Sequence, residues 1–313
     1  MPDVSSSLSY SECETKTRLL CYFSHTLMGL CACFGAHSRR GLSCSKGTYM
    51  AHIHIYTGAG ESVPHPTVRT ITAADLWDSL ARGYDDFRAM PTHLMFLGLI
   101  YPIAGIVLAG FSFGYNLFPM LFPLAAGFAL IGPIAAIGLY ELSRQREEGN
   151  EPDMRHVLDV VRSPSFPAIA TISAVLAVLF LTWLFVAQTL YESLFGYLPP
   201  ASMSQLMYDV LTTPSGHTLF IAGNLIGLAF AIVAMVVGVV SFPLLLDRDV
   251  GVIAALATSV RAVAHNVATM TLWGLIVAAL LLIGSVPLFV GLAIVVPVLG
   301  HATWHLYRKL IAR

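Results

Sequence analysis

Long apolar runs dominate the chain from residue 92 onward. Each is close to the length of about 20 residues that a helix needs to cross the hydrocarbon core of a bilayer. There are six such runs, at residues 92–113, 119–140, 167–190, 219–243, 270–286 and 287–307. They are continuous rather than alternating between apolar and polar, which predicts helices and not the strands of a closed barrel.

An amphipathic stretch precedes the first run. Thr72 and Asp75 have the spacing of a capping box, which predicts that a helix begins there. Apolar residues then recur every three to four positions, at Leu76, Leu80, Tyr84 and Phe87. Charged residues such as Asp78 and Asp85 exclude insertion into the bilayer. We therefore expect residues 72–89 to form a helix in the plane of the membrane surface, with Tyr84 and Phe87 facing the lipid or the ends of the first two runs, and with Asp78 and Asp85 facing water.

The chain also repeats itself. Residues 123–144 resemble residues 287–308 at a constant offset, which places Pro133 opposite Pro297. A fainter third copy begins at Ser163. The predicted unit is an in-plane helix followed by a two-helix hairpin. Three such units give an all-α, polytopic membrane bundle of six transmembrane helices in three hairpins.

The in-plane helix has a counterpart before the fifth run. Val260 and Val263 stand at distances from that run that match those in the first copy. We expect both valines to be buried and Arg261 to point outward.

The positions of Lys and Arg predict the topology. Beyond residue 50 they all lie before the first run, between the second and third, between the fourth and fifth, or after the sixth. The positive-inside rule then places both termini in the cytoplasm. Several charged residues fall at the cytoplasmic ends of the runs and form one layer, in which we expect ion pairs between helices: Arg144, Asp247, Arg248 and Arg308. The outer loop, residues 191–217, has apolar residues at helical spacing, and it either docks a partner or lies on the outer leaflet.

Composition narrows the class of protein. Of 313 residues, 56% are hydrophobic and only 11% are charged. A soluble enzyme, a nucleic-acid-binding protein and a disordered protein are excluded, because average soluble domains carry about 25% charged residues. The net charge of −1 gives no polyelectrolyte signal. This composition predicts that the protein is embedded in a lipid bilayer, which is its main partner.

The first 49 residues differ from the rest. All five cysteines precede Met50. We interpret residues 1–49 as a poorly structured extension or a mis-assigned start, residues 50–71 as a cytoplasmic tail, and residues 72–313 as the transmembrane domain. A signal peptide and a seventh span are the alternatives. Two closely spaced thiols, at Cys31 and Cys33, make a weak metal motif.

Two histidines provide the clearest candidate site. His301 and His305 are four residues apart, on one face of the last run. This spacing can hold a metal ion or present an axial haem ligand, and Glu141, the repeat equivalent of His305, is the candidate third ligand. We prefer the alternative that these histidines, with Trp304 and Tyr307, form an interfacial belt.

Other polar or helix-breaking positions lie inside the runs. Pro133 and Pro297 kink helices at equivalent positions, which is typical of a transporter site or of close packing against glycine. Asn224 and Gln188 are the intramembrane amides. We expect hydrogen bonds between helices from them, with a polar pocket as the alternative.

Several motifs, in order, resemble one bacterial family. They lie at residues 88–91, 138–144, 241–249, 258–263 and 297–308. The family is that of predicted integral membrane proteins known as domain of unknown function 2189, and the resemblance runs from about residue 68 to the C-terminus. It implies a bacterial inner-membrane protein and no activity. Members are sometimes labelled as similar to cytochrome c oxidase subunit I, but this chain lacks the six membrane histidines that two haems and a copper need.

Three functions are open at this point. The first is a non-enzymatic scaffold, accessory or assembly factor, with a partner such as a respiratory complex. The second is a transporter or channel for a neutral or lipid-like solute. The third is a haem- or metal-binding membrane protein that uses His301 and His305.

Overall fold

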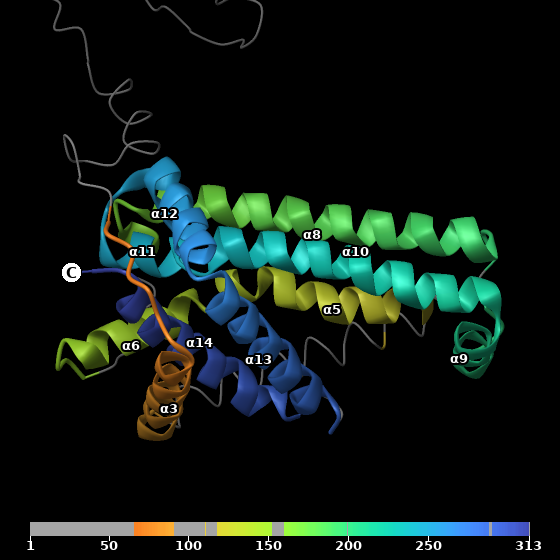
Figure 1. The fold of residues 1–313 in the computed structure, drawn as a ribbon, viewed down its shortest axis with the longest axis horizontal. Coiled ribbons are helices and arrows are strands. Elements are labelled where there is room, and N and C mark those ends of the chain that lie inside the picture. The colour runs from red at the N-terminus through yellow and green to blue at the C-terminus, as the bar shows by residue number, and fades with distance from the viewer. Residues whose placement is uncertain are drawn as a thin grey trace, which may run out of the picture. The chain divides into compact units, whose positions relative to one another are not determined.

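The computed structural model describes residues 66–90, 110, 118–151, 160–198, 200–287 and 290–312. Within these ranges the regular elements are helices, with one isolated bridge between Val68 and Ile311. The first helices are α3 (Ala73–Ala89), α5 (Phe118–Ala135), α6 (Ile137–Glu147), the 3-10 turn η1 (Val160–Arg162) and α8 (Phe166–Phe195). The rest are α9 (Met203–Thr212), α10 (Pro214–Gly238), α11 (Ser241–Asp247), α12 (Gly251–His265), α13 (Val267–Ser285) and α14 (Leu292–Leu310) (Figure 1).

Four helical segments in the described ranges are long and apolar enough to cross a membrane. They are Pro119–Glu147, which combines α5 and α6; Phe166–Phe195; Pro214–Asp247, which combines α10 and α11; and Val267–Ser285. These match the second to fifth predicted runs. The first run lies outside the described residues apart from Gly110. The sixth run forms α14, which is not among the four because its second half is polar.

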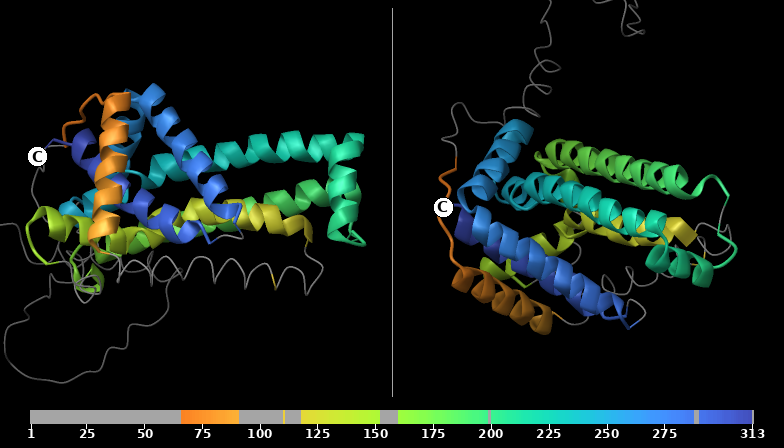
Figure 2. Two further views of the ribbon diagram at one scale, coloured as in Figure 1. Left: turned by 90° about the horizontal axis from the view of Figure 1, so that it is seen from below. Right: turned by 45° about the vertical axis from the view of Figure 1, so that its right-hand side comes forward.

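Consecutive long helices pair as helical hairpins where both helices are described. α8 and α10 lie side by side, and α9 lies across their far end (Figures 1 and 2). α9 is the helix that the apolar spacing in residues 191–217 indicated. α13 and α14 form a second, tight hairpin: a Cβ on Gly291 would lie 2.8 Å from the Cα of Gly284. Only glycines allow the two backbones to approach this closely.

The second helix of the first two units is interrupted at equivalent positions, whereas α14 of the third unit is continuous. α5 gives way to α6 around Ala136, and α10 gives way to α11 after Gly238. Beyond this point each of α6, α11 and α14 carries a buried aromatic residue followed two positions later by a buried leucine: Tyr140 and Leu142, Phe242 and Leu244, and Trp304 and Leu306. The same pattern in all three units supports the predicted repeat, including its faint middle copy.

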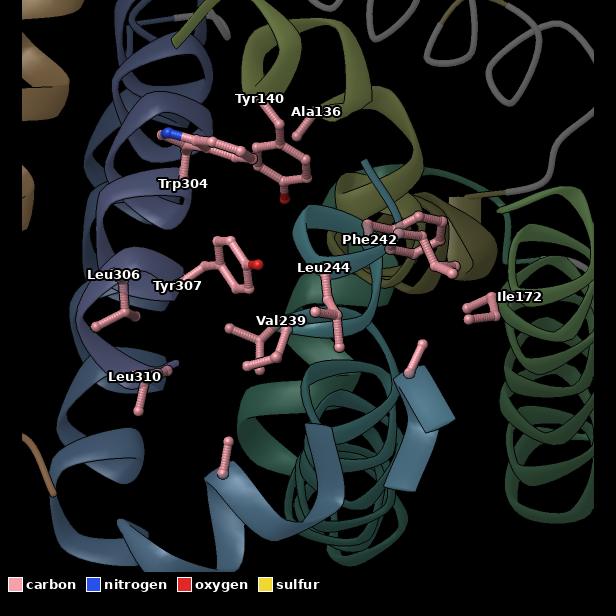
Figure 3. Close-up of a cluster of buried hydrophobic side chains, with 14 of the residues drawn as sticks. Ala136, Tyr140, Ile172, Val239, Phe242, Leu244, Trp304, Leu306, Tyr307 and Leu310 are labelled. Carbon is pink, nitrogen blue, oxygen red and sulfur yellow. The ribbon is translucent and has the colours of Figure 1, made fainter. Parts of the chain in front are cut away.

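These ends form a packed layer beside the spanning segments. Figure 3 shows the buried side chains of α14 facing those of α6 and α11. Trp304 and Tyr307 are the largest side chains in the layer and are almost completely enclosed. α3 and α12 cover the layer from outside.

α3 confirms the prediction of a helix over residues 72–89, with the Thr72–Asp75 capping box formed. Its buried face, however, is rotated away from the predicted apolar one. The residues that pack on α14 are mostly small or polar: Leu76, Ser79, Gly83 and Asp86. A Cβ on Gly83 would lie 2.5 Å from the backbone nitrogen of Ala302, so the two helices touch through their backbones. Close contact of this kind selects small residues rather than the bulky Tyr84.

α12 repeats this arrangement on α10 and α11. Its buried face has the same spacing as that of α3: Val252, Ala255, Ser259 and Ala262. Arg261 points outward as predicted, and Val263 is partly buried. The prediction for Val260 was wrong, because this side chain is 48% exposed. Ser259 takes the inner position instead, where its hydroxyl donates to the Val236 carbonyl at 2.6 Å.

The first described residues tie the ends of the domain together. The backbone N–H of Arg69 donates to the Leu310 carbonyl at 2.8 Å, and the N–H of Ala312 donates to the Thr67 carbonyl at 3.0 Å. Asn266, at the junction of α12 and α13, accepts from the Ile71 N–H at 2.8 Å. This segment therefore fixes the start of α3 beside the start of α13.

Candidate functional site

A buried polar cluster lies where α3, α6 and α14 meet. α3 contributes Asp86, α6 contributes Ser143 and Arg146, and α14 contributes His301 and His305. His301 and His305 share a helix face because they are four residues apart. Asp86 reaches them because Gly83, one turn earlier, lets α3 approach α14 so closely.

Asp86 is the centre of the cluster. Its Oδ2 accepts hydrogen bonds from the Ser143 hydroxyl at 2.7 Å and from His305 Nε2 at 2.8 Å. Its Oδ1 accepts from the guanidinium of Arg146. Only 4% of Asp86 is exposed. A buried carboxylate normally needs this many charge-assisted partners to remain ionised.

These partners set the protonation of Asp86. Burial alone would raise its pKa, but the hydrogen bonds from His305 and Ser143, with the nearby His301, bring the pKa below its ordinary value of 3.8. The carboxylate is therefore ionised at neutral pH and holds its neighbours electrostatically.

Ser143 connects Asp86 to His301. Its Oγ lies 2.6 Å from His301 Nδ1. With the serine hydroxyl directed at Asp86, the tautomer that fits this second bond has its proton on Nδ1. His301 Nε2 is then an acceptor, and it is buried with no hydrogen-bond partner in the described part of the chain.

This order of groups is not that of a catalytic triad. In a triad the histidine stands between serine and carboxylate and takes the serine proton. Here the serine stands between them and donates its hydrogen bond to the carboxylate. The cluster can therefore bind three helices to one another, but it does not activate Ser143 as a nucleophile.

In the structure, the two histidines do not meet the carboxylate that was expected to complete a metal site with them. The carboxylate that meets the histidines is Asp86 and not Glu141. Glu141 is buried elsewhere in the layer, where it accepts from Arg144 at 2.7 Å and from Gln145 at 3.0 Å. Across the described ranges, no group of three or more His, Cys, Asp or Glu side chains is placed to hold a metal ion.

The preferred interpretation of an interfacial belt was also wrong for this end of α14. Trp304 and His301 are each 0% exposed, and Tyr307 is 1% exposed. The polar atoms of Trp304 and Tyr307 bond to protein: the Trp304 indole N–H donates to Glu147 at 3.1 Å, and the Tyr307 hydroxyl donates to Asp247 at 2.6 Å. The surrounding helices, rather than lipid headgroups, satisfy these side chains.

The predicted ion pairs between helix ends are confirmed beside the cluster. Arg308 of α14 bonds Glu147 of α6 at 3.0 Å and Asp247 of α11 at 3.2 Å. Arg144 pairs within its own helix, with Glu141 and Glu148. These groups line a cleft of about 440 Å³ that is formed by Arg144, Glu147, Glu148, Asp247, Arg248, Trp304 and Arg308. The three helix ends are thus joined by charge as well as by apolar packing.

The remaining predicted residues lie away from the cluster and have structural contacts. Pro133 packs on Gly238, where a Cβ would lie 2.8 Å from the proline ring. Pro297 is buried within α14. The two amides bond within their own helices and not between helices as expected: Asn224 donates to the Phe220 carbonyl at 2.7 Å, and Gln188 donates to Glu192 at 2.6 Å.

Asp86, Ser143 and Arg146 were not predicted. A charged residue on an amphipathic helix normally faces water, and nothing in the local pattern sets Asp86 apart from Asp85. A usable signal was Gly83, since a glycine in the middle of a helix indicates close approach of another backbone. The residue one turn further along the same face is then a buried position.

Comparison with known proteins agrees with the membrane architecture. A family model described as predicted integral membrane protein (DUF2189) matches residues 120–247. No curated protein and no solved structure matches the chain. The matched residues include two of the four candidate spans completely and most of a third, and they end with α11. The protein is therefore a multi-pass membrane protein that is similar, over residues 120–247, to the DUF2189 family of predicted integral membrane proteins.

Proposed function

We propose that the protein is a non-enzymatic scaffold, accessory or assembly factor of the bacterial inner membrane, which holds a membrane-protein partner such as a respiratory complex. The observation that carries this proposal is that the polar groups of the site bond to other helices of the same protein. Asp86 of α3 bonds Ser143 of α6 and His305 of α14, and Arg308 of α14 joins α6 to a fourth helix, α11. Such bonding stabilises a fixed surface and leaves no activated group for chemistry.

The same contacts weigh against the other two functions. Pro133, which suggested a transporter, packs on Gly238 as a structural kink would. Asn224 and Gln188, which suggested a polar pocket, bond within their own helices. A haem or metal would compete with Asp86 for His305. Scaffolding is the function that agrees with all of these contacts.

We propose six crossings in total, with residues 92–113 as the first and α14 as the last, and with both termini in the cytoplasm. The tight contact of Gly284 with Gly291 supports a hairpin of α13 and α14. The bonds of Arg69 to Leu310 and of Thr67 to Ala312 support termini on one side. The layer of α6, α11 and the end of α14 then faces the cytoplasm, in agreement with its arginines.

Purification from native membranes in a mild detergent, followed by native mass spectrometry, tests the scaffold. We expect the full chain to co-purify with a membrane protein at a fixed ratio. Asp86→Ala should loosen the layer and lower this ratio, whereas Asn224→Ala, which removes a bond within one helix, should leave it unchanged. A chain that always purifies alone would contradict the proposal.

A further inference from the structure

Both in-plane helices carry a second apolar face that no described residue covers. On α3 it contains Trp77 and Tyr84, which are 61% and 48% exposed. On α12 it contains Ile253 and Val260, which are 61% and 48% exposed. In each helix the two residues are seven positions apart, or about two turns, so they lie on one line along the helix.

The two faces occupy equivalent positions in the repeat. Trp77 follows the buried Leu76 by one residue, and Ile253 follows the buried Val252 by one residue. Tyr84 follows Gly83 in the same way, and Val260 follows Ser259. The same place in two copies is apolar although the side chains differ. This indicates that both surfaces face the same kind of environment.

α12 shows what that environment is. Just past the helix break at Asn266, Val267 is 61% exposed and is the first residue of α13. α13 is a candidate membrane span, and its own exposed side chains, Leu275 and Leu282, are those that lipid must cover. The end of α12 therefore lies directly beside a surface that lipid covers.

α3 begins beside the first turn of α13. The Thr269 hydroxyl of α13 donates to the Ile71 carbonyl at 3.1 Å, immediately before the cap of α3. The outer face of α3 has the composition of a membrane interface, with tryptophan, tyrosine and an arginine, Arg88, whose guanidinium lies 5.9 Å from the centre of the Tyr84 ring. Asp85 lies on a third, exposed side of the helix, and Asp78 pairs with Arg82 and with Lys309 of α14.

We propose that α3 and α12 are interfacial anchors whose outer faces lie in the boundary between lipid headgroups and acyl chains of one leaflet. Each helix then has three sides: one on the protein core, one in lipid and one in water. This inference does not rest on the scaffold proposal, because the partner is the bilayer itself. Because lipid then occupies these faces, a protein partner would bind to other surfaces of the layer.

Site-directed spin labelling tests the proposal on the full chain. The five native cysteines are replaced by serine, and the protein is reconstituted in vesicles of phosphatidylethanolamine and phosphatidylglycerol. Single labels are placed by Tyr84→Cys and Val260→Cys, with the adjacent Asp85→Cys and Arg261→Cys as matched controls. Leu282→Cys on α13 supplies the reference inside the bilayer. The accessibility of each label to oxygen and to a water-soluble nickel chelate is measured by power saturation.

We expect the ratio of oxygen to nickel accessibility at Tyr84 and Val260 to exceed that at Asp85 and Arg261 several-fold, and to lie below that at Leu282. Ratios at Tyr84 and Val260 equal to those of their neighbours would place the faces in water and overturn the proposal. Labels that are immobilised and shielded from both reagents would show that protein covers the faces, and would overturn it as well. Because the purified chain is alone in the vesicle, the absence of a scaffold partner does not affect either result.

Discussion

The contact between α3 and α14 makes Gly83→Ala a sharp test of the packing. The new Cβ would lie 2.5 Å from Ala302 N and 2.7 Å from Val298 O, both of which are backbone atoms that cannot move aside alone. Tolerable contacts begin near 3.4 Å, so α3 must retreat by about 0.9 Å. Overpacking of this kind costs about 1–3 kcal/mol. Replacing glycine by alanine within a helix returns at most about 1 kcal/mol.

The retreat has a further cost, because Asp86 is one turn away and its bonds to Ser143 and His305 depend on the same approach. We therefore expect a net loss of about 2 kcal/mol, measured as a lower thermal midpoint by circular dichroism in detergent. Gly132→Ala is the matched control, since a Cβ there meets nothing within 4 Å. An equal or higher midpoint for Gly83→Ala would refute the backbone contact.

Four further results are expected. Asp86→Ala should lower the stability by about 3–5 kcal/mol in the same assay, because it leaves the buried partners of the carboxylate unpaired. Asp86→Asn should lower the stability by less. A thermal midpoint of Asp86→Ala equal to that of the unmodified protein would contradict the cluster. The pKa of Asp86 is lowered on folding, so its contribution is complete above the ordinary value of 3.8 and is lost as the pH falls through the lower folded value; unfolding at acid pH should therefore become less pH-dependent in Asp86→Asn. The purified protein should be colourless and free of metal, and a Soret band that is lost in His301→Ala would revive haem binding. A reporter fused after residue 313 should score as cytoplasmic.

The sequence allowed the membrane architecture to be predicted because the responsible signals are local. An apolar run of about 20 residues has few other stable outcomes. The capping box of Thr72 and Asp75 fixed the start of α3 for the same reason. Charges at helix ends pair with charges in the same layer, so the contact of Arg308 with Asp247 could also be anticipated.

The inner faces could not be predicted from hydrophobicity. Near a bilayer an apolar residue has two favourable environments, protein and lipid, so Val260 gave no indication of which it would face. A charged residue is likewise ambiguous. Asp86 is buried because His305, 219 positions later in the chain, lies opposite it. That contact depends on how the first and third copies pack, which no local pattern records.

The packing of the copies explains why the polar cluster occurs where it does. α3, from the first copy, lies on α14 of the third, and α12, from the third copy, lies on α10 and α11 of the second. At the second of these contacts Ala262 takes the place of Asp86, and the joint is made by apolar packing and the bond of Ser259 to Val236. The first contact joins helices from opposite ends of the domain, where chain connectivity does not hold the pairing. Buried charged groups specify a unique pairing more strictly than apolar surfaces do, at some cost in stability. We therefore interpret Asp86 and its histidines as the contact that selects α14 as the partner of α3.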